Sequence, residues 1–263
     1  MSLQRLFRLC SFFGLDPKSL ILNARGVSSF LRDLRRYNQM GGPTAFRISF
    51  RDMRPCLSDR YAAAGTFHSH YFHQDLWAAR KIFERRPHKH LDVGSRLDGF
   101  VAHVLAFMPV TVLDLRPLEA DVEGLLFVRD DATSMSHFDD NSIDSLSSLN
   151  VAEHFGLGRY SDAVDPNGCF QFMSALERVL SPGGRLYFSV PIGRERVEFN
   201  AHRVFGVETV LSSFPRLTVV SFSFVDDDGQ FHKDVDPAEV PRSEYACGLF
   251  EFTKAPAVTA SVA

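Results

Sequence analysis

A buried strand followed by a glycine turn constrains the fold of this chain more than any other feature. The segment Leu91–Phe100 (LDVGSRLDGF) contains both, and the apolar run Val110–Leu115 (VTVLDL) follows it. Gly94 begins the turn, and Asp114 stands about twenty residues after it, near the end of the second apolar run. This layout is typical of a nucleoside-cofactor site at the edge of an α/β sheet, and it predicts a bound adenosine.

The glycines of the turn indicate which adenosine compound would fit. Dinucleotide sites use Gly-x-Gly-x-x-Gly, in which the middle glycine lets the backbone approach a pyrophosphate. Gly94 and Gly99 hold the first and third positions here, whereas Arg96 holds the middle one. The tight turn and the close helix packing are therefore retained, while the pyrophosphate seat is lost. This argues against an NAD-dependent oxidoreductase and favours S-adenosylmethionine (SAM), which has no pyrophosphate.

Three further motifs follow in order within residues 88–193. The acidic pair Asp130 and Asp131 comes after an apolar run. Residues 142–154 (SIDSLSSLNVAEH) read as a strand that leads into a Glu-His loop, and residues 176–186 (LERVLSPGGRL) read as a helix, a Pro-Gly-Gly turn and a strand. With these motifs the chain resembles the class I SAM-dependent methyltransferases.

Within that superfamily the chain also resembles a small methyltransferase-like family of uncharacterised function. The resemblance implies a Rossmann-like α/β sheet, mostly parallel, with seven strands, the last strand reversed and helices on both faces. The chain departs from the superfamily pattern at Arg96 and Asp98, which stand where later glycines of the first motif would be. Some bacterial members of the small family lie among surface-polysaccharide genes, which implies a role in polysaccharide biosynthesis.

The alternation of apolar strands with helices also predicts a mainly parallel sheet covered on both faces. We expect an N-terminal helical accessory segment at residues 1–60, broken at Asp16-Pro17, a methyltransferase-like domain at 61–254 and a loose tail at 255–263. Strands are expected near 89–93, 110–115, 125–128, 143–149, 185–190, 217–225 and 245–253, and helices near 74–84, 97–107, 168–180 and 204–213.

Composition limits the alternatives. A chain of 263 residues with 45% hydrophobic residues is ample for a large core, and a formal charge of -3 argues against general nucleic-acid binding. The first 40 residues hold seven basic and two acidic side chains, so this segment is expected to be a solvated accessory helix, to contact an anionic membrane surface or to mediate oligomer contacts. The four cysteines form no C-x-x-C pair, and no apolar run is long enough to span a membrane. We expect a cytoplasmic protein.

The resemblance assigns several residues to SAM. Gly94 is expected to let the backbone approach the methionine end, and Asp92 to organise the turn or to reach the ammonium group through water. Asp114 is expected to accept hydrogen bonds from the ribose hydroxyls, and Asp131 from the adenine amino group. Tyr71 belongs to a segment that is expected to cover the cofactor as a lid.

Asn150, Glu153 and His154 follow the fourth predicted strand and should face the ligand crevice. Asn150 is expected at the cofactor and Glu153 at the acceptor, while His154 is a candidate base because an imidazole ordinarily titrates near neutral pH. Alternatively, Glu153 and His154 fix the loop by hydrogen bonds. Some superfamily members bind a divalent ion with Glu-x-x-Glu-His, but Asn150 replaces the first Glu here, so no metal is expected. His202 is a second candidate base, and Arg203 a candidate acceptor contact. Alternatively, Asn200 in the same segment serves as the N-terminal cap of a helix.

These observations predict a SAM-dependent methyltransferase that acts on an oxygen or nitrogen of a small molecule or saccharide. The rival interpretation is a methyltransferase-like protein that has lost catalysis and serves as a binding or scaffold partner. Its support is the altered first motif, in which Arg96 and Asp98 replace glycines. Cofactor affinity separates the two, because a scaffold has no need to retain it.

Overall fold

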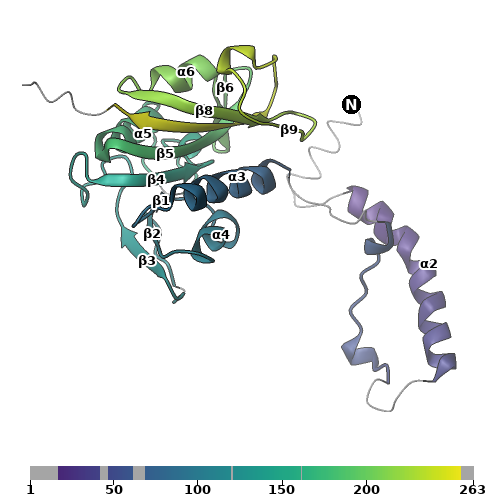
Figure 1. Ribbon diagram of the computed structural model, residues 1–263. Coiled ribbons are helices and arrows are strands. Elements are labelled where there is room, and N and C mark those ends of the chain that lie inside the picture. Colours follow the sequence, from purple (N-terminus) through teal and green to yellow (C-terminus); the bar gives the residue numbers. More distant parts are fainter. Residues whose placement is uncertain (1–16, 42–46, 62–68, 120, 161, 256–263) are drawn as a thin grey trace, which may run out of the picture. The chain divides into compact units, whose positions relative to one another are not determined.

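The chain forms two compact units, Met1–Phe67 and His68–Ala263, which we call the N-terminal and C-terminal units. The computed structural model describes residues 17–41, 47–61, 69–119, 121–160 and 162–255 (Figure 1). All of the site residues that the sequence predicts belong to the C-terminal unit.

The described part of the N-terminal unit is built on helix α2 (Pro17–Met40), with the short helices η2 (Phe50–Asp52) and η3 (Asp59–Tyr61) after it. A proline suits the first turn of a helix, so the predicted break at Asp16-Pro17 is a helix start. The helix expected before it lies outside the described residues. Gly26 lets the returning chain approach α2, since a Cβ there would lie 2.1 Å from the Leu57 carbonyl oxygen. None of the helices described here is long and apolar enough to cross a membrane.

The C-terminal unit contains an eight-stranded sheet in the order β3-β2-β1-β4-β5-β10-β8-β9. Its parallel half consists of β1 (Leu91–Val93), β2 (Val110–Asp114), β3 (Leu125–Arg129), β4 (Ile143–Leu149) and β5 (Leu180–Ile192). The strand order reverses between β1 and β4, and such a switch point opens a crevice at the carboxyl ends of the strands.

The other half of the sheet carries the reversed strand. Strand β10 (Ala246–Lys254) lies antiparallel between β5 and β8 (Leu217–Val225), which confirms the predicted reversal. The structure adds β9 (Phe231–His232) at the edge and a separate hairpin of β6 (Arg196–Glu198) and β7 (His202–Val204). These strands have two or three residues each. Such short strands show no periodic pattern in the sequence, so they could not be predicted from it.

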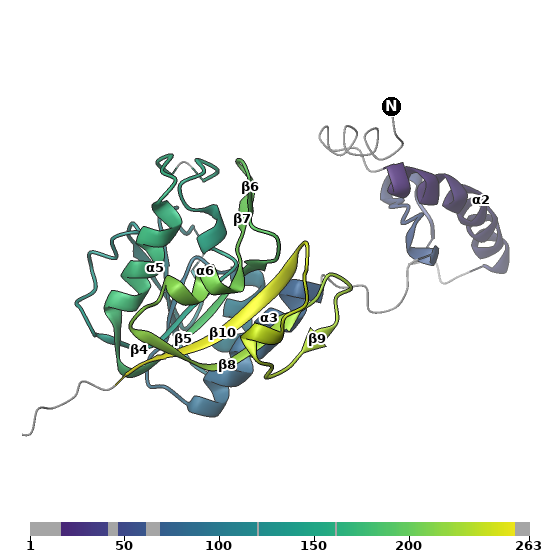
Figure 2. The same cartoon turned by 90° about the horizontal axis from the view of Figure 1, so that it is seen from above.

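Helices cover both faces of the sheet (Figure 2). On one face α5 (Gly168–Val179) and α6 (Val207–Ser212) pack on Phe188 and Phe250, and on the other α3 (Ser69–Arg85) and α4 (Ala102–Leu105) share a second core with Tyr187 and Leu249. Neighbouring residues of β5 and of β10 thus enter different cores because side chains alternate along a strand. Burial on both faces explains why these strands read as continuous apolar runs.

The helix predicted at 97–107 begins differently. Residues Leu97–Val101 form a π-helical turn, η4, before α4. The Val101 N–H donates to the Arg96 carbonyl at 3.2 Å, a bond that spans five residues rather than four. The wider turn directly follows the glycine turn after β1.

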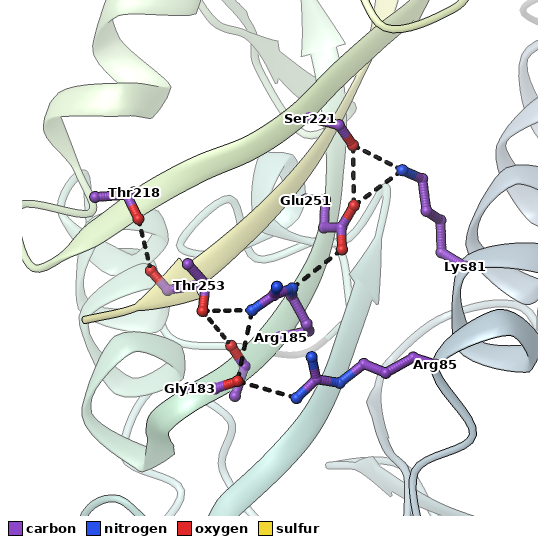
Figure 3. A network of polar contacts seen from close by, with 9 residues as sticks. Lys81, Arg85, Gly183, Arg185, Thr218, Ser221, Glu251 and Thr253 are labelled. Carbon is purple, nitrogen blue, oxygen red and sulfur yellow. Dashed lines mark hydrogen bonds and ion pairs between the residues drawn. The ribbon is translucent and has the colours of Figure 1, made fainter. Parts of the chain in front are cut away.

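Polar contacts tie α3 to three strands of the sheet (Figure 3). Lys81 Nζ lies 2.9 Å from a carboxylate oxygen of Glu251 on β10 and donates to the Ser221 hydroxyl on β8 at 2.8 Å. Arg185 on β5 binds the other oxygen of Glu251 at 3.2 Å, and Arg85 donates to a backbone carbonyl of β5 at 2.9 Å. The C-terminal half of α3 is therefore held by three strands, while its first turn lies at the crevice.

Candidate functional site

A cavity of about 720 Å³ lies at the carboxyl ends of β1, β2 and β4. Ligand pockets of proteins typically have about 300–1,000 Å³. Six of the ten predicted site residues line this cavity together: Tyr71, Gly94, Asp114, Asp131, Asn150 and His154. Asp92, Glu153, His202 and Arg203 are not among the residues that line it.

The turn after β1 depends on Gly94. Its φ of 71° lies in the left-handed region, and a Cβ there would approach Val151 Cγ1 to 2.9 Å. The N–H of Gly94 donates to the Leu113 carbonyl on β2 at 3.0 Å, which joins the turn to the neighbouring strand. Backbone is thus exposed to the cavity where any larger residue would intrude.

Asp92 stabilises the turn through hydrogen bonds of its side chain. It is fully buried, and its carboxylate accepts hydrogen bonds from the Ser95 N–H at 3.0 Å, the Ser95 hydroxyl at 2.6 Å and the Ser147 hydroxyl at 2.6 Å. Burial raises the pKa of Asp92 to about 6. Of the two roles considered for Asp92, this geometry supports organisation of the turn.

Arg96 and Gly99 complete the first motif. A Cβ on Gly99 would lie 2.5 Å from a carboxylate oxygen of Asp75 on α3, so the glycine permits close packing. Arg96 lines the cavity, pairs with Asp98 at 3.2 Å and places its guanidinium 4.9 Å from the ring centroid of Tyr71. The arginine that replaces a glycine therefore lies beside the predicted lid residue.

Asp114 ends β2 at the cavity, where a carboxylate can reach a ribose. It is already engaged by Arg116, whose Nη2 and Nε lie 2.6 and 3.0 Å from its two oxygens. The Arg116 guanidinium also lies 4.8 Å from the ring centroid of Tyr160. A ribose at this point has to share the Asp114 carboxylate with Arg116.

The two acids after β3 have different roles. Asp130 is buried and accepts from the N–H groups of Asp131 and His137 and from the Ser136 hydroxyl. Burial raises the pKa of Asp130, but the His137 imidazole, whose Nδ1 lies 2.9 Å from Oδ2, and these hydrogen bonds bring it below its usual value. Asp131 lines the cavity, and its contacts with Thr133 are made by one carboxylate oxygen. The geometry therefore makes Asp131, rather than Asp130, the acid available to a ligand.

Asn150, Glu153 and His154 follow β4. Asn150 has a φ of 53° and its N–H donates to the Ser189 carbonyl at 2.9 Å, so the chain turns sharply into the cavity wall. Glu153 and His154 belong to the short helix η5 (Ala152–His154). His154 faces the cavity, whereas Glu153 is buried behind it.

His202 and Arg203 lie on β7. The His202 ring is 5.1 Å from that of Tyr245, and its Nε2 lies 3.4 Å from Glu198. Arg203 is buried and donates to the Phe155 carbonyl, so its guanidinium holds the loop after η5.

The structure adds Arg116 and Tyr160 to the cavity wall. Their stacking joins the loop after β2 to the loop after η5, two segments whose proximity no spacing in the sequence indicates. In the described ranges, no group of three or more His, Cys, Asp or Glu side chains is arranged to hold a metal ion.

Comparison with known proteins agrees with this architecture. A profile of the family described as "Caenorhabditis protein of unknown function, DUF268" matches residues 125–226. No curated protein matches the chain. The crystal structure of the [4+2]-cyclase SpnF is similar with a TM-score of 0.51 at 14% identity, over 70% of this chain and 82% of that one.

A proposed sarcosine dimethylglycine methyltransferase from Galdieria sulphuraria is similar with a TM-score of 0.50 at 12% identity, over 69% of this chain and 85% of that one. These likenesses show that the chain has a methyltransferase-like fold. One similar protein is a cyclase and the other carries a methyltransferase name, so the reaction has to be argued from the site.

Proposed function

We propose that the chain is a SAM-dependent methyltransferase that acts on an oxygen or nitrogen of a small molecule or saccharide. The observation that carries the proposal is the cavity at the strand-order switch, where Gly94 exposes backbone and Asp114 and Asp131 present carboxylates from neighbouring strand ends. Its volume of about 720 Å³ suits a nucleoside-sized cofactor together with an acceptor.

The residues present fit SAM. Gly94 would lie at the methionine end, Asp114 at the ribose and Asp131 at the adenine, with Asn150 and Tyr71 on the cavity wall. When bound, SAM supplies an electrophilic methyl group on a sulfonium. The chain then has to orient the acceptor, exclude water and receive the acceptor's proton. His154 is the imidazole on the cavity wall and is placed for the last of these tasks.

One observation favours the scaffold alternative. Arg116 occupies both oxygens of Asp114, and an arginine stands in the first motif in place of a glycine. If these contacts persist, the ribose seat is closed and the cavity no longer holds the cofactor. Cofactor binding therefore decides between the two functions.

The test is calorimetric titration of the full chain with SAM, S-adenosylhomocysteine (SAH) and NAD. We expect micromolar binding of SAM and SAH, weakened tenfold or more in Asp114→Asn, which corresponds to about 1.4 kcal/mol. Asp140→Asn is the matched control, because Asp140 pairs with Arg178 at 2.6 Å, as Asp114 does with Arg116, but lies outside the cavity. Binding of neither SAM nor SAH to the wild type would contradict the proposal and support the scaffold.

A further inference from the structure

Glu153 is a buried acid with an unsatisfied oxygen. Its side chain is 3% exposed, and Oε2 has no hydrogen-bond partner among the residues that the structure describes. A buried carboxylate oxygen without a partner is costly, so burial favours the protonated acid and raises the pKa of Glu153 to about 8. Oε1 lies 3.7 Å from Nε2 of His154. The acid therefore faces the imidazole that lines the cavity.

The hydrogen bonds of His154 fix which nitrogen is free. Nδ1 lies 2.7 Å from the Ala201 carbonyl oxygen, which can only accept, so Nδ1 carries the hydrogen. The longer 3.4 Å contact of Arg159 with Nδ1 is then no hydrogen bond, since Arg159 donates to Ala201 instead at 3.0 Å. Burial lowers the pKa of His154 to about 4, so the ring is neutral near pH 7. Nε2 is therefore the ring nitrogen with a free lone pair, and it lies 3.7 Å from Glu153, too far for a hydrogen bond.

The surroundings keep this pair uncharged near neutral pH. Tyr71 on α3 and Tyr245 and Cys247 at the start of β10 lie near enough to Glu153 that its charge raises the pKa of each, after burial as the main cause. A backbone hydrogen bond within Glu153 and, to a lesser extent, the charge of Arg159 oppose the upward shift of the Glu153 pKa. Arg159 and His202 both oppose protonation of His154, while Asp162 and the Ala201 carbonyl favour it.

We propose that Glu153 acts through His154 as one proton-sharing pair, which takes up the proton that the acceptor releases on methylation. Glu153 is then a positioning residue, and His154 is the group that meets the acceptor. The inference rests on the proposed function and deepens it, because it says where the acceptor's proton goes.

The proton balance is simple. The acceptor's O–H or N–H bond breaks as its bond to the methyl carbon forms, and the proton moves to Nε2 of His154. The step requires ionised Glu153, which is the minor form below the pKa of about 8, so the step should become faster as the pH rises toward 8. The imidazolium and the carboxylate then together carry no net charge. The proton passes to Glu153 as the pair shortens to a hydrogen bond of about 3 Å, and it returns through His154 to water before the next cycle.

The pair can be tested without an acceptor by nuclear magnetic resonance of the full chain labelled with ¹⁵N in histidine and ¹³C in glutamate. The His154 signals are assigned from a His154→Gln spectrum. We expect Nδ1 of His154 to remain protonated, and Nε2 to shift at the same pH, near 8, at which the Glu153 carboxyl carbon titrates. In Glu153→Gln the shift of Nε2 should be lost. Glu198→Gln is the control, because Glu198 faces His202 instead.

A His154 titration that is identical in the wild type and in Glu153→Gln would overturn the pairing. If Glu153→Gln does not fold, the wild-type spectra decide, since the Glu153 and His154 signals must share one midpoint. SAH binding measured on the same samples separates the two proposals. We expect wild type and Glu153→Gln to bind SAH within twofold of each other, whereas absence of binding refutes the proposed function and leaves the pairing to be read from the spectra.

Discussion

Replacing Glu153 by glutamine removes a buried ionisable group and should change the pH dependence of stability by an amount that the structure sets. Burial raises the pKa of Glu153 from 4.5 to about 8. Between these values the folded chain holds one proton more than the unfolded chain, so the free energy of unfolding falls as the pH rises. The slope is about 1.4 kcal/mol per pH unit until Glu153 ionises in the folded state.

Three other buried groups with shifted pKa values affect stability at a lower pH than Glu153 does. His90 and His154 have pKa values lowered to about 3 and about 4, and that of Asp92 is raised to about 6. These three groups affect stability below about pH 6.5, the ordinary pKa of a histidine. From about pH 6.5 to 8.5, the free energy of unfolding of the wild type should fall by about 2 kcal/mol because of Glu153. This decrease should be absent in Glu153→Gln.

Urea unfolding at the two pH values measures this difference. Trp77, the one tryptophan of the chain, is buried in α3, so its fluorescence reports the C-terminal unit. Glu198→Gln, which removes a half-exposed carboxylate, should keep the wild-type pH dependence. Equal changes in the wild type and in Glu153→Gln, within about 0.5 kcal/mol, would refute the reasoning from burial.

Two further predictions concern the turn and α3. Gly94→Ala should destabilise the C-terminal unit by about 1–3 kcal/mol and weaken SAH binding tenfold or more, because a Cβ meets Val151 and the φ of 71° is strained; urea unfolding and calorimetry test this, and wild-type values in both would contradict it. Lys81→Met should lower the free energy of unfolding of the C-terminal unit by about 1–3 kcal/mol, because Glu251 on β10 loses one charged partner, Lys81, and keeps the other, Arg185. A double-mutant cycle with Glu251→Gln checks that the loss belongs to the pair, and additive effects would contradict it.

The sheet could be predicted because its physical causes lie in short stretches of sequence. Burial on both faces makes β5 and β10 continuously apolar, and glycine at position 94 marks the turn after β1. Parallel strands end at one edge of the sheet, so acids such as Asp114 and Asp131 were expected together, and they line one cavity.

The remaining features depend on contacts between distant segments. The sequence does not show that Arg116 would bind Asp114 or stack on Tyr160, because the loops that bring them together have no periodic pattern. Nor does it show that Glu153 and Arg203 are buried beside the cavity rather than exposed in it. Spacing places a charged residue near a site, but the path of the loop decides which way its side chain points.

The reactivity of the Cys247 thiol can report when the core around β10 opens. It lies at the start of β10, paired with both β5 and β8, and is 1% exposed, and burial raises the pKa of its thiol. Alkylating reagents attack exposed thiolates, and the Cys247 thiol packs against α3, so they can reach it only when α3 lifts from the sheet or β10 separates from its neighbours. Cys56 in the N-terminal unit is exposed and should react at once. Mapping the labelled peptides over time would therefore measure how often the core between α3 and β10 opens, in the native protein and without denaturant.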